Sequence, residues 1–368
     1  MLIGGKWVDK SDKINVYNPE DDSLIDTVPR AEVKDVEEAY KIAERGKDVM
    51  RKLSTYDKYL ILRKAAQIIE SRKEEFAETI AKEGVKTIRE ARKETSRAIN
   101  TLTYAAEEAK RLSGELVNID ADFRREYRFG YFIREPVGIV LAITPYNDPL
   151  NMVAHKVSPA IAAGNAIILK PTYLTPLSAL KMGEVLLEAG LPEEAISIIT
   201  GKSGDIGDAL ITDPRPRVIT FTGGVEAGEI ITRKAGIKKL AMELGSSCAV
   251  IVMDDADLEL AVPAIVDGSF SAAGQNCIGV QRLYVHKKVY DRFVSEFVDK
   301  TKKLKVGKKL DESTDMGPMI TKEEANRVEE WVKEAQELGG KILTGGTRNG
   351  NFLRTDYNRK STQTCKSC

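Results

Sequence analysis

The sequence predicts an α/β protein with a parallel sheet. Between residues 137 and 244, short apolar runs alternate with segments whose apolar residues recur every three or four positions. This is the rhythm of strands joined by crossover helices. The alternation resumes after residue 256, and a chain of 368 residues is long enough for two domains. We therefore expect two α/β units.

Composition indicates a globular protein without a polyanionic partner. Lys and Arg total 56, as do Asp and Glu, so neither nucleic acid nor an anionic membrane surface is expected to bind. No apolar run approaches the roughly 18 residues of a membrane span, and the N-terminus lacks the layout of a signal peptide. Four scattered cysteines form no disulfide framework, and two histidines supply a zinc site poorly. A cytoplasmic protein without a metal site is expected, and abundant Lys and Glu favour a thermophilic source.

The first third of the chain is predicted to begin with strands and continue with helices. Residues 1–30 carry Asn-Pro and Asp-rich turn signals between short apolar runs. Residues 32–114 show helical spacing with mixed charges on the other face, which indicates a solvated helix surface. Residues 124–134, FRREYRFGYFI, alternate aromatic and basic residues and predict a half-exposed β-hairpin. In a neutral chain, such a hairpin suits a subunit contact better than nucleic acid.

The later elements follow in strand–loop–helix order. Strands are expected in VGIVLAIT (137–144), NAIILK (165–170), AISIIT (195–200), RVITFTG (217–223) and KLAMEL (239–244). Helices are expected at 151–164, 177–190, 203–211 and 226–236. In the second unit, a strand RLYVHKK (282–288) is expected among helices at 256–274, 289–304 and 322–340.

Polar residues stand at the ends of these strands. Asn147 lies in the loop after the first strand, Lys170 ends the second, TGGVEAG (222–228) leads from the fourth into a helix, and Glu243 is near the end of the fifth. Because ligands bind at the carboxyl ends of parallel strands, these residues are candidates for one site. Singly, each has an ordinary alternative: a turn residue, a solvated strand end, a flexible turn or a surface carboxylate.

Cys277 lies in the stretch AAGQNCIGVQR (272–282). A cysteine is more often a small packed side chain than a nucleophile. With the strand-end residues, however, a specific chemistry becomes available. A thiolate attacks an aldehyde, an amide and a backbone N–H stabilise the oxyanion, a nicotinamide accepts the hydride, and a carboxylate activates water on the thioester. A glycine turn at a helix N-terminus suits a pyrophosphate.

These motifs, in this order, resemble the aldehyde dehydrogenase superfamily. The resemblance is carried by REPVGIVLAITPYNDPLN, GNAIILKPTYLTP, VITFTGGVEAG, MELG and GQNCIGVQR, and it extends from IGGKWVDKSD to about GGTRNGNF. It implies that Cys277 is the nucleophile, Asn147 the oxyanion amide and Glu243 the general base, with Lys156 near the active site. The cofactor residues that it implies are Thr144, Pro145, Lys170, Thr172, Tyr173, Thr222, Gly223 and Gly224, with Lys170 at the adenine-side ribose and Thr222 to Gly224 beside the pyrophosphate.

The resemblance also implies a domain organisation. A Rossmann-like NAD(P)-binding domain would comprise residues 1–118 and 140–244, with an oligomerisation hairpin at 119–139. An incomplete α/β catalytic domain would follow at 245–351, and residues 352–368 would form an aberrant tail. A homodimer or homotetramer is expected of a chain with a complete C-terminus.

Two departures from the family pattern bear on the cofactor. Gly224 stands where a serine is common, so one hydroxyl donor is lost. Tyr173 stands where a glutamate often accepts from the adenine ribose. Without that carboxylate, a 2′-phosphate is less strongly repelled, so both NAD and NADP remain open. Cys248, in ELGSSC, is interpreted as a packed thiol.

PYNDPLN and GQNCIGVQR look most like the lactaldehyde and non-phosphorylating glyceraldehyde-3-phosphate dehydrogenase branch. The expected substrate is a small hydroxyaldehyde, such as lactaldehyde or glyceraldehyde 3-phosphate, which Asn276 would hydrogen-bond. Two alternatives remain: a CoA-acylating relative, against which Glu243 argues, and an inactive cofactor-binding remnant.

The end of the chain departs from the family. The expected Glu-x-Phe-Gly-Pro stretch is missing, and LRTDYNRKSTQTCKSC has no apolar periodicity. Reading one base later in a suitable back-translation gives Tyr-Gly-Pro-Thr-Ile-Ile-Glu, so a frameshift near residue 352 is expected. On this hypothesis, the CxxC spacing of Cys365 and Cys368 carries no metal or redox meaning, and the incomplete catalytic domain exposes apolar surface and strand edges.

Overall fold

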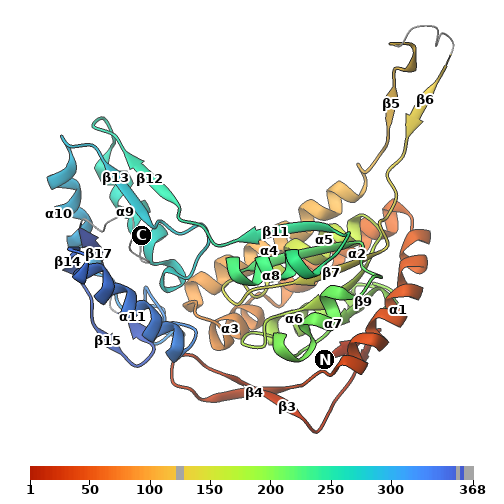
Figure 1. The fold of residues 1–368 in the computed structure, drawn as a ribbon, viewed down its shortest axis with the longest axis horizontal. Coiled ribbons are helices and arrows are strands. Elements are labelled where there is room, and N and C mark those ends of the chain that lie inside the picture. Colours follow the sequence, from red (N-terminus) through yellow and green to blue (C-terminus); the bar gives the residue numbers. More distant parts are fainter. Residues whose placement is uncertain (122–127, 354–356, 360–368) are drawn as a thin grey trace.

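The computed structural model describes residues 1–121, 128–353 and 357–359. Its centre is a seven-stranded sheet of order β11-β10-β7-β8-β9-β1-β2 (Figure 1). Strands β7 to β11 run parallel, while β1 lies antiparallel to β9 and to β2. The predicted α/β class is confirmed. The strands are β1 (Leu2–Ile3), β2 (Lys6–Trp7), β7 (Ile139–Ile143), β8 (Ala166–Lys170), β9 (Ile196–Ile198), β10 (Val218–Gly223) and β11 (Lys239–Leu244).

Helices cover both faces of this sheet because its central strands are apolar on both sides. Val140 and Ile167 belong to a buried core with helices α2 to α6. Their chain neighbours Ile139 and Ile168 point the other way, into a core with α1, α7 and α8. The helices are α1 (Val33–Lys52), α2 (Thr55–Ser71), α3 (Lys73–Glu83), α4 (Ile88–Ala109), α5 (Asn151–Ala162), α6 (Leu177–Glu188), α7 (Ser203–Thr212) and α8 (Val225–Lys234).

The chain after β11 forms a smaller α/β unit at one end of the large sheet (Figure 1). Strands β12 and β13 pair in parallel, and α9 and α10 cover them with a core that contains the stacked rings of Phe293 and Phe297. The unit's first element is β12, at Ala249, which precedes the helix predicted from 256 and was not predicted, because AVIV is a strand too short to stand out by periodicity. Its main elements are β12 (Ala249–Val252), α9 (Leu258–Phe270), β13 (Arg282–Val285), α10 (Tyr290–Thr301) and α11 (Lys322–Glu337).

The predicted helix 256–274 is wrong at its end. Helix α9 stops at Phe270, and a short 3₁₀ segment, Ser271–Gly274, follows. Within that segment, Ala272 and Ala273 have left-handed backbones with φ of +52° and +55°. Alanine has no intrinsic preference for this conformation, which costs about 1–2 kcal/mol per residue, so local sequence could not reveal the turn.

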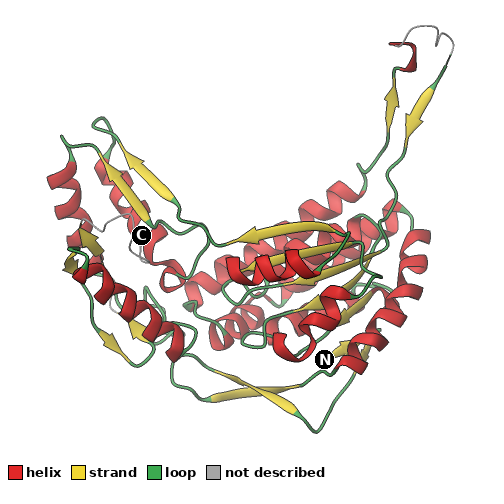
Figure 2. Ribbon diagram, in the orientation of Figure 1, coloured by secondary structure: helices red, strands yellow, loops and turns green. Residues whose placement is uncertain are grey.

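The predicted hairpin also has other bounds. Strands β5 (Glu115–Val117) and β6 (Gly130–Phe132) pair antiparallel, so the first strand precedes the expected 124–134 segment. The two strands project away from the sheet (Figure 2). The cross-strand partners Leu116 and Tyr131 are 71% and 67% exposed. Residues 122–127 of the predicted hairpin lie outside the described residues.

Shorter strands complete the fold. β3 (Lys13–Tyr17) pairs with β4 (Leu24–Pro29), β14 (Lys341–Thr344) with β17 (Tyr357–Arg359), and β15 (Arg348–Asn349) with β16 (Phe352–Leu353). Leu353 is buried with Met319 and Ala325. Most of the predicted aberrant tail, residues 354–356 and 360–368, lies outside the described residues. Across the described ranges, no helix has both the length and the apolar character needed to span a membrane.

Candidate active site

The strand-end residues singled out in the sequence come together at one edge of the sheet. Lys170 is paired with Ile143 at the last position of their parallel strands, and Glu243 is paired with Thr222 one residue before the ends of theirs. Thr144, the residue after β7, donates its backbone N–H to the carbonyl of Lys170 at 3.2 Å. The lysine, the threonine of the glycine turn and the carboxylate therefore share one sheet edge, because the strands run parallel.

Cys277 is exposed and follows the left-handed turn, two residues after Gln275. The Gln275 side chain fixes the end of this turn. Its Nε2 donates to the carbonyl of Ala272 at 3.0 Å, and its Oε1 accepts from the backbone N–H of Ile320 at 3.0 Å. Below the turn, Ser246 Oγ donates to the Cys277 carbonyl at 2.5 Å. We refer to residues 271–277 as the cysteine loop.

Asn147 joins the sheet edge to the cysteine loop. Its Nδ2 donates to the carbonyl of Gln275 at 2.9 Å. A side-chain amide nitrogen carries two hydrogens, so one remains to donate to a second acceptor beside the cysteine loop. The pairing spans 128 residues of sequence, and it ties the predicted site residue Asn147 to the loop that carries the predicted site residue Cys277.

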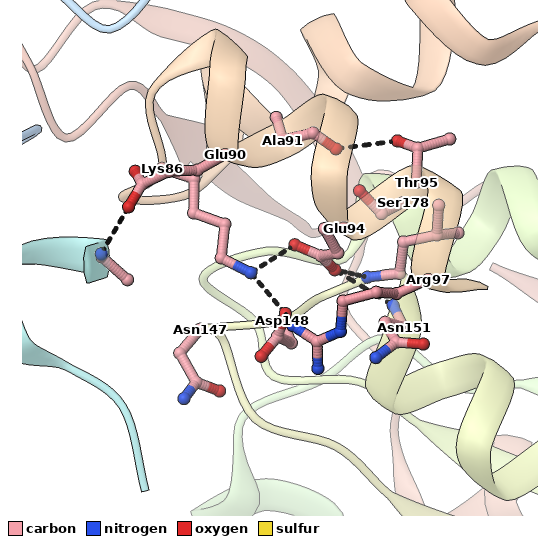
Figure 3. Close-up of polar contacts among 12 residues, drawn as sticks. Lys86, Glu90, Ala91, Glu94, Thr95, Arg97, Asn147, Asp148, Asn151 and Ser178 are labelled. Atoms are coloured by element: carbon pink, nitrogen blue, oxygen red, sulfur yellow. Dashed lines mark hydrogen bonds and ion pairs between the residues drawn. The ribbon is translucent and has the colours of Figure 1, made fainter. Parts of the chain in front are cut away.

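A buried ionic cluster holds the loop that carries Asn147 (Figure 3). Lys86 Nζ lies 2.8 Å from Glu94 Oε2 and also contacts Asp148. Burial opposes the charge on Lys86, but the two carboxylates outweigh it and raise the pKa of the ammonium. Burial likewise raises the pKa of Glu94, against the pull of Lys86. Glu94 Oε1 in turn accepts the backbone N–H groups of Leu150 and Asn151, at the start of α5, at 2.8 and 3.0 Å.

Lys156 lies beneath the sheet edge on α5. It is buried, and its Nζ donates to Thr220 Oγ1 at 3.0 Å. Burial lowers the pKa of this ammonium to about 8, while the charge of Glu243 opposes the shift. Glu243 itself is exposed on β11. The lysine and the carboxylate are therefore electrostatically coupled within the candidate site.

The candidate cofactor residues line the same edge. Lys170 is buried, which lowers its pKa to about 8, and the charge of Asp205 opposes that shift. Tyr173 is 37% exposed, and Lys202 Nζ lies 5.6 Å from the centre of its ring. Thr172 Oγ1 accepts the backbone N–H of Leu174 at 3.5 Å. The side chains of Pro145 and Asn276 are half-buried, and Gly223 ends β10.

Sequence reasoning did not find Arg97, Lys86 or Glu94. Arg97, on α4, is half exposed and lies 3.5 Å from Asp148, one residue beyond Asn147 (Figure 3). Glu94 offered a signal, because it occupies the apolar stripe of its helix beside Ala91 and Ala98, where a charge must be paired. Arg97 offered none, because exposed arginines are common on helix surfaces.

The chain is similar to known proteins of one family. The profile of the aldehyde dehydrogenase family matches residues 7–357. A 3-sulfolactaldehyde dehydrogenase from Priestia aryabhattai is 46% identical over 96% of this chain and 73% of its own length. A lactaldehyde dehydrogenase from Methanocaldococcus jannaschii is 40% identical over 95% of this chain and 75% of its own length. The crystal structure of the glyceraldehyde-3-phosphate dehydrogenase GapN from Methanocaldococcus jannaschii, complexed with NADP, superimposes with a TM-score of 0.90 at 39% identity, over 95% of this chain and 76% of that chain.

Proposed function

Because the chain belongs to the aldehyde dehydrogenase family, as its sequence predicted, we propose that it oxidises a small hydroxyaldehyde with an acidic substituent to the carboxylate. Lactaldehyde is the uncharged parent compound and glyceraldehyde 3-phosphate is an anionic member of the class, and the similarity to a 3-sulfolactaldehyde dehydrogenase supports an anionic substrate. The observation that carries the proposal is the 2.9 Å hydrogen bond from Asn147 Nδ2 to the Gln275 carbonyl, since it sets an amide donor beside the loop of the nucleophile.

The residues divide the chemistry among them. The Cys277 thiolate attacks the aldehyde carbon, and the Asn147 amide stabilises the resulting oxyanion. When bound, NAD(P) supplies the acceptor for the hydride. Glu243 then removes a proton from the water that hydrolyses the thioester. Glu243 favours hydrolysis over transfer to CoA, because a CoA-acylating enzyme needs no water activation.

The chain's own residues fit an NAD(P) cofactor. Thr222 Oγ1 is buried without a hydrogen-bond partner in the described part of the chain. Gly224 opens α8, and a Cβ at this position would meet no atom within 4 Å, so a pyrophosphate can approach the helix N-terminus. Tyr173, Lys202 and Arg30 line a cavity of about 590 Å³. Besides Arg30 and Lys202, the charged residues that line this cavity are Lys13, Lys322, Asp22 and Glu323. Because Lys202 lies beside the Tyr173 ring and position 173 carries no carboxylate, the cavity favours a 2′-phosphate, and hence NADP over NAD.

Arg97 is the proposed partner of the acidic substituent. Its guanidinium is half exposed beside the loop of Asn147, and arginine binds phosphate, sulfonate and carboxylate groups through parallel N–H donors. Asn276, half-buried next to Cys277, is the proposed partner of the substrate hydroxyl.

The β5–β6 hairpin is proposed as a subunit contact. Leu116 and Tyr131 expose apolar surface on both strands, and Phe129 beside them is 76% exposed. Apolar residues gathered on a projecting ribbon are typical of protein–protein interfaces. With a complete C-terminus, a homodimer or homotetramer is the assembly that we infer.

The proposed function is tested by NADP and NAD reduction with the purified chain. The substrates are glyceraldehyde 3-phosphate, lactaldehyde and propanal. We expect turnover with NADP exceeding that with NAD, and kcat/KM highest for the anionic aldehyde. If the chain binds the cofactor but reduces it with none of the aldehydes, the result would contradict the proposal and favour the alternative of an inactive cofactor-binding remnant. Turnover that depends on added CoA would favour the acylating alternative.

Replacing Arg97 with methionine is expected to raise the KM for glyceraldehyde 3-phosphate by about 10- to 100-fold, the loss of one or two charge-assisted hydrogen bonds. The KM for propanal should change little, because propanal has no anionic group. Arg111→Met removes an exposed cation just past the C-terminal end of the same helix and serves as the control. Equal effects of Arg97→Met on both aldehydes would contradict the assignment.

Replacing Lys170 with methionine is expected to stabilise the protein and weaken NADP binding. The folded pKa of about 8 lies below the ordinary 10.5, so the folded state binds this proton more weakly than the unfolded state. The resulting loss of folding stability is greatest below pH 8 and disappears as the pH rises toward 10.5. At pH 7 the free energy of unfolding should therefore rise by on the order of 1–3 kcal/mol.

Urea denaturation of wild type and variant at pH 7 and pH 10 measures the stability effect, and the KM for NADP measures the binding effect. The exposed Lys303→Met is the control. A stability gain that is as large at pH 10 as at pH 7 would contradict the burial argument. An unchanged KM would contradict the cofactor assignment.

A further inference from the structure

The cysteine loop begins in a conformation that its own sequence does not favour. Ala272, Ala273 and Gly274 are consecutive left-handed residues, with φ of +52°, +55° and +75°. Left-handed backbone is unfavourable for alanine, so contacts from elsewhere must impose the turn. Ala272 is fully buried beside Val85 and Ile320, which fills the space around the turn but supplies no partner for its backbone.

Glu90 supplies that partner. Its Oε1 accepts the backbone N–H of Ala272 at 2.9 Å and the hydroxyl of Ser271 at 3.0 Å. Its Oε2 accepts the backbone N–H of Thr87 at 2.9 Å and the Thr87 hydroxyl at 3.1 Å, which forms the capping box of α4. One oxygen of the carboxylate therefore fixes the helix start, and the other fixes the first left-handed residue of the cysteine loop.

Glu94, one helical turn further along α4, fixes the other loop of the candidate site, which carries Asn147. It accepts the backbone N–H groups of Leu150 and Asn151 and binds Lys86, which contacts Asp148. Residues four apart lie on the same helix face, and Figure 3 shows both carboxylates directed toward the loops that they hold. A single rigid helix thus contacts the Asn147 loop and the cysteine loop at once.

We propose that Glu90 is a positioning residue, which fixes the cysteine loop so that Cys277 meets the Asn147 amide. This inference rests on the proposed role of Cys277. In the described part of the chain, the Glu90 carboxylate is hydrogen-bonded to Thr87, Ser271 and Ala272 and not to Cys277, so it acts through the backbone of Ala272. Without its carboxylate, the Ala272 N–H loses its acceptor and the left-handed turn can relax. A displacement of about 1 Å at a reacting atom can cost on the order of 100-fold in rate.

Asp57 is a matched control in the same protein. It occupies the same third position of helix α2, and it accepts the backbone N–H and hydroxyl of Ser54 in an equivalent capping box. Within the described part of the chain, its carboxylate is hydrogen-bonded to Ser54 and not to the cysteine loop. Asp57→Ala therefore removes a capping carboxylate and its stability contribution, but leaves the cysteine loop intact.

The test compares Glu90→Ala, Glu90→Gln and Asp57→Ala with wild type. We expect both Glu90 variants to lower kcat about 10- to 100-fold with an unchanged KM for NADP. The alkylation rate of Cys277 by iodoacetamide, followed by mass spectrometry of its peptide, should change at least about fivefold. Ser271→Ala, which removes only the hydroxyl donor, should shift both readouts in the same direction by a smaller factor. Asp57→Ala should leave both within about twofold of wild type while lowering the melting temperature.

Equal effects of the Glu90 and Asp57 variants on kcat and alkylation would overturn the inference, since helix capping alone would then explain them. If the wild-type chain shows no aldehyde turnover, the proposed function is refuted instead. In that case the alkylation rates of folded wild type and variants still decide the role of Glu90, because they report the environment of Cys277 without catalysis.

Discussion

Replacing Cys277 with alanine is expected to lower the kcat of aldehyde-dependent NADP reduction by at least about 10⁴-fold. The expected loss is large because, in the proposed mechanism, the thiolate makes the bond that every later step needs. In that mechanism, the hydride leaves only from the tetrahedral adduct on Cys277, and Glu243 acts only on the thioester that remains. NADP should still bind, since the proposed cofactor residues lie on the sheet edge and the α8 N-terminus, away from the cysteine loop.

The measurement pairs steady-state NADPH formation with the quenching of intrinsic fluorescence on NADP binding. Cys248→Ala is the control, because the Cys248 thiol lies 3.3 Å from the Cys277 carbonyl and so tests disturbance of the same loop without loss of the nucleophile. Residual turnover of Cys277→Ala within tenfold of wild type would refute the mechanism. Equal losses of NADPH formation in both variants would mean that turnover depends on the conformation of the loop and not on the Cys277 thiol.

Replacing Glu243 with glutamine is expected to stop the reaction after hydride transfer. The first turnover should survive and give a burst of NADPH close to the enzyme concentration. Steady-state turnover should then fall by about 10²- to 10⁴-fold, the usual contribution of a general base. Glutamine keeps the size of the side chain but cannot accept the proton of water, so the thioester on Cys277 accumulates.

Rapid-mixing absorbance at 340 nm separates the burst from the steady state, and intact mass spectrometry detects the acyl group on the chain. Hydroxylamine should restore turnover, because a strong nucleophile needs no general base. Glu229→Gln, an exposed carboxylate on α8, controls for the loss of charge. A variant with neither burst nor acyl adduct would show that Glu243 acts before thioester formation, contrary to the proposed role.

Much of the sheet and part of the site were predictable from local pattern. The strands at 137–144, 165–170 and 217–223 are buried apolar runs bounded by turn residues, and each appears where expected. Lys170 and Glu243 could be assigned to one edge, because strand direction alone fixes which ends of parallel strands meet. The predicted helix at 256–274 extends too far, because Ala272 and Ala273 are good helix formers that tertiary contacts hold in left-handed backbone.

The sequence by itself determined the fold class, the family and the identity of the candidate chemical groups. Periodicity and strand-end residues are local properties, and motif order is written along the chain. Only the tertiary structure decided which groups meet. Asn147 bonds Gln275, Glu90 bonds Ala272, and Arg97 lies beside Asp148. Such pairs depend on the packing of α4 and α5 against each other and on the path of the cysteine loop. No local pattern encodes these contacts, because a hydrogen bond between distant segments depends on a fit of a few tenths of an ångström.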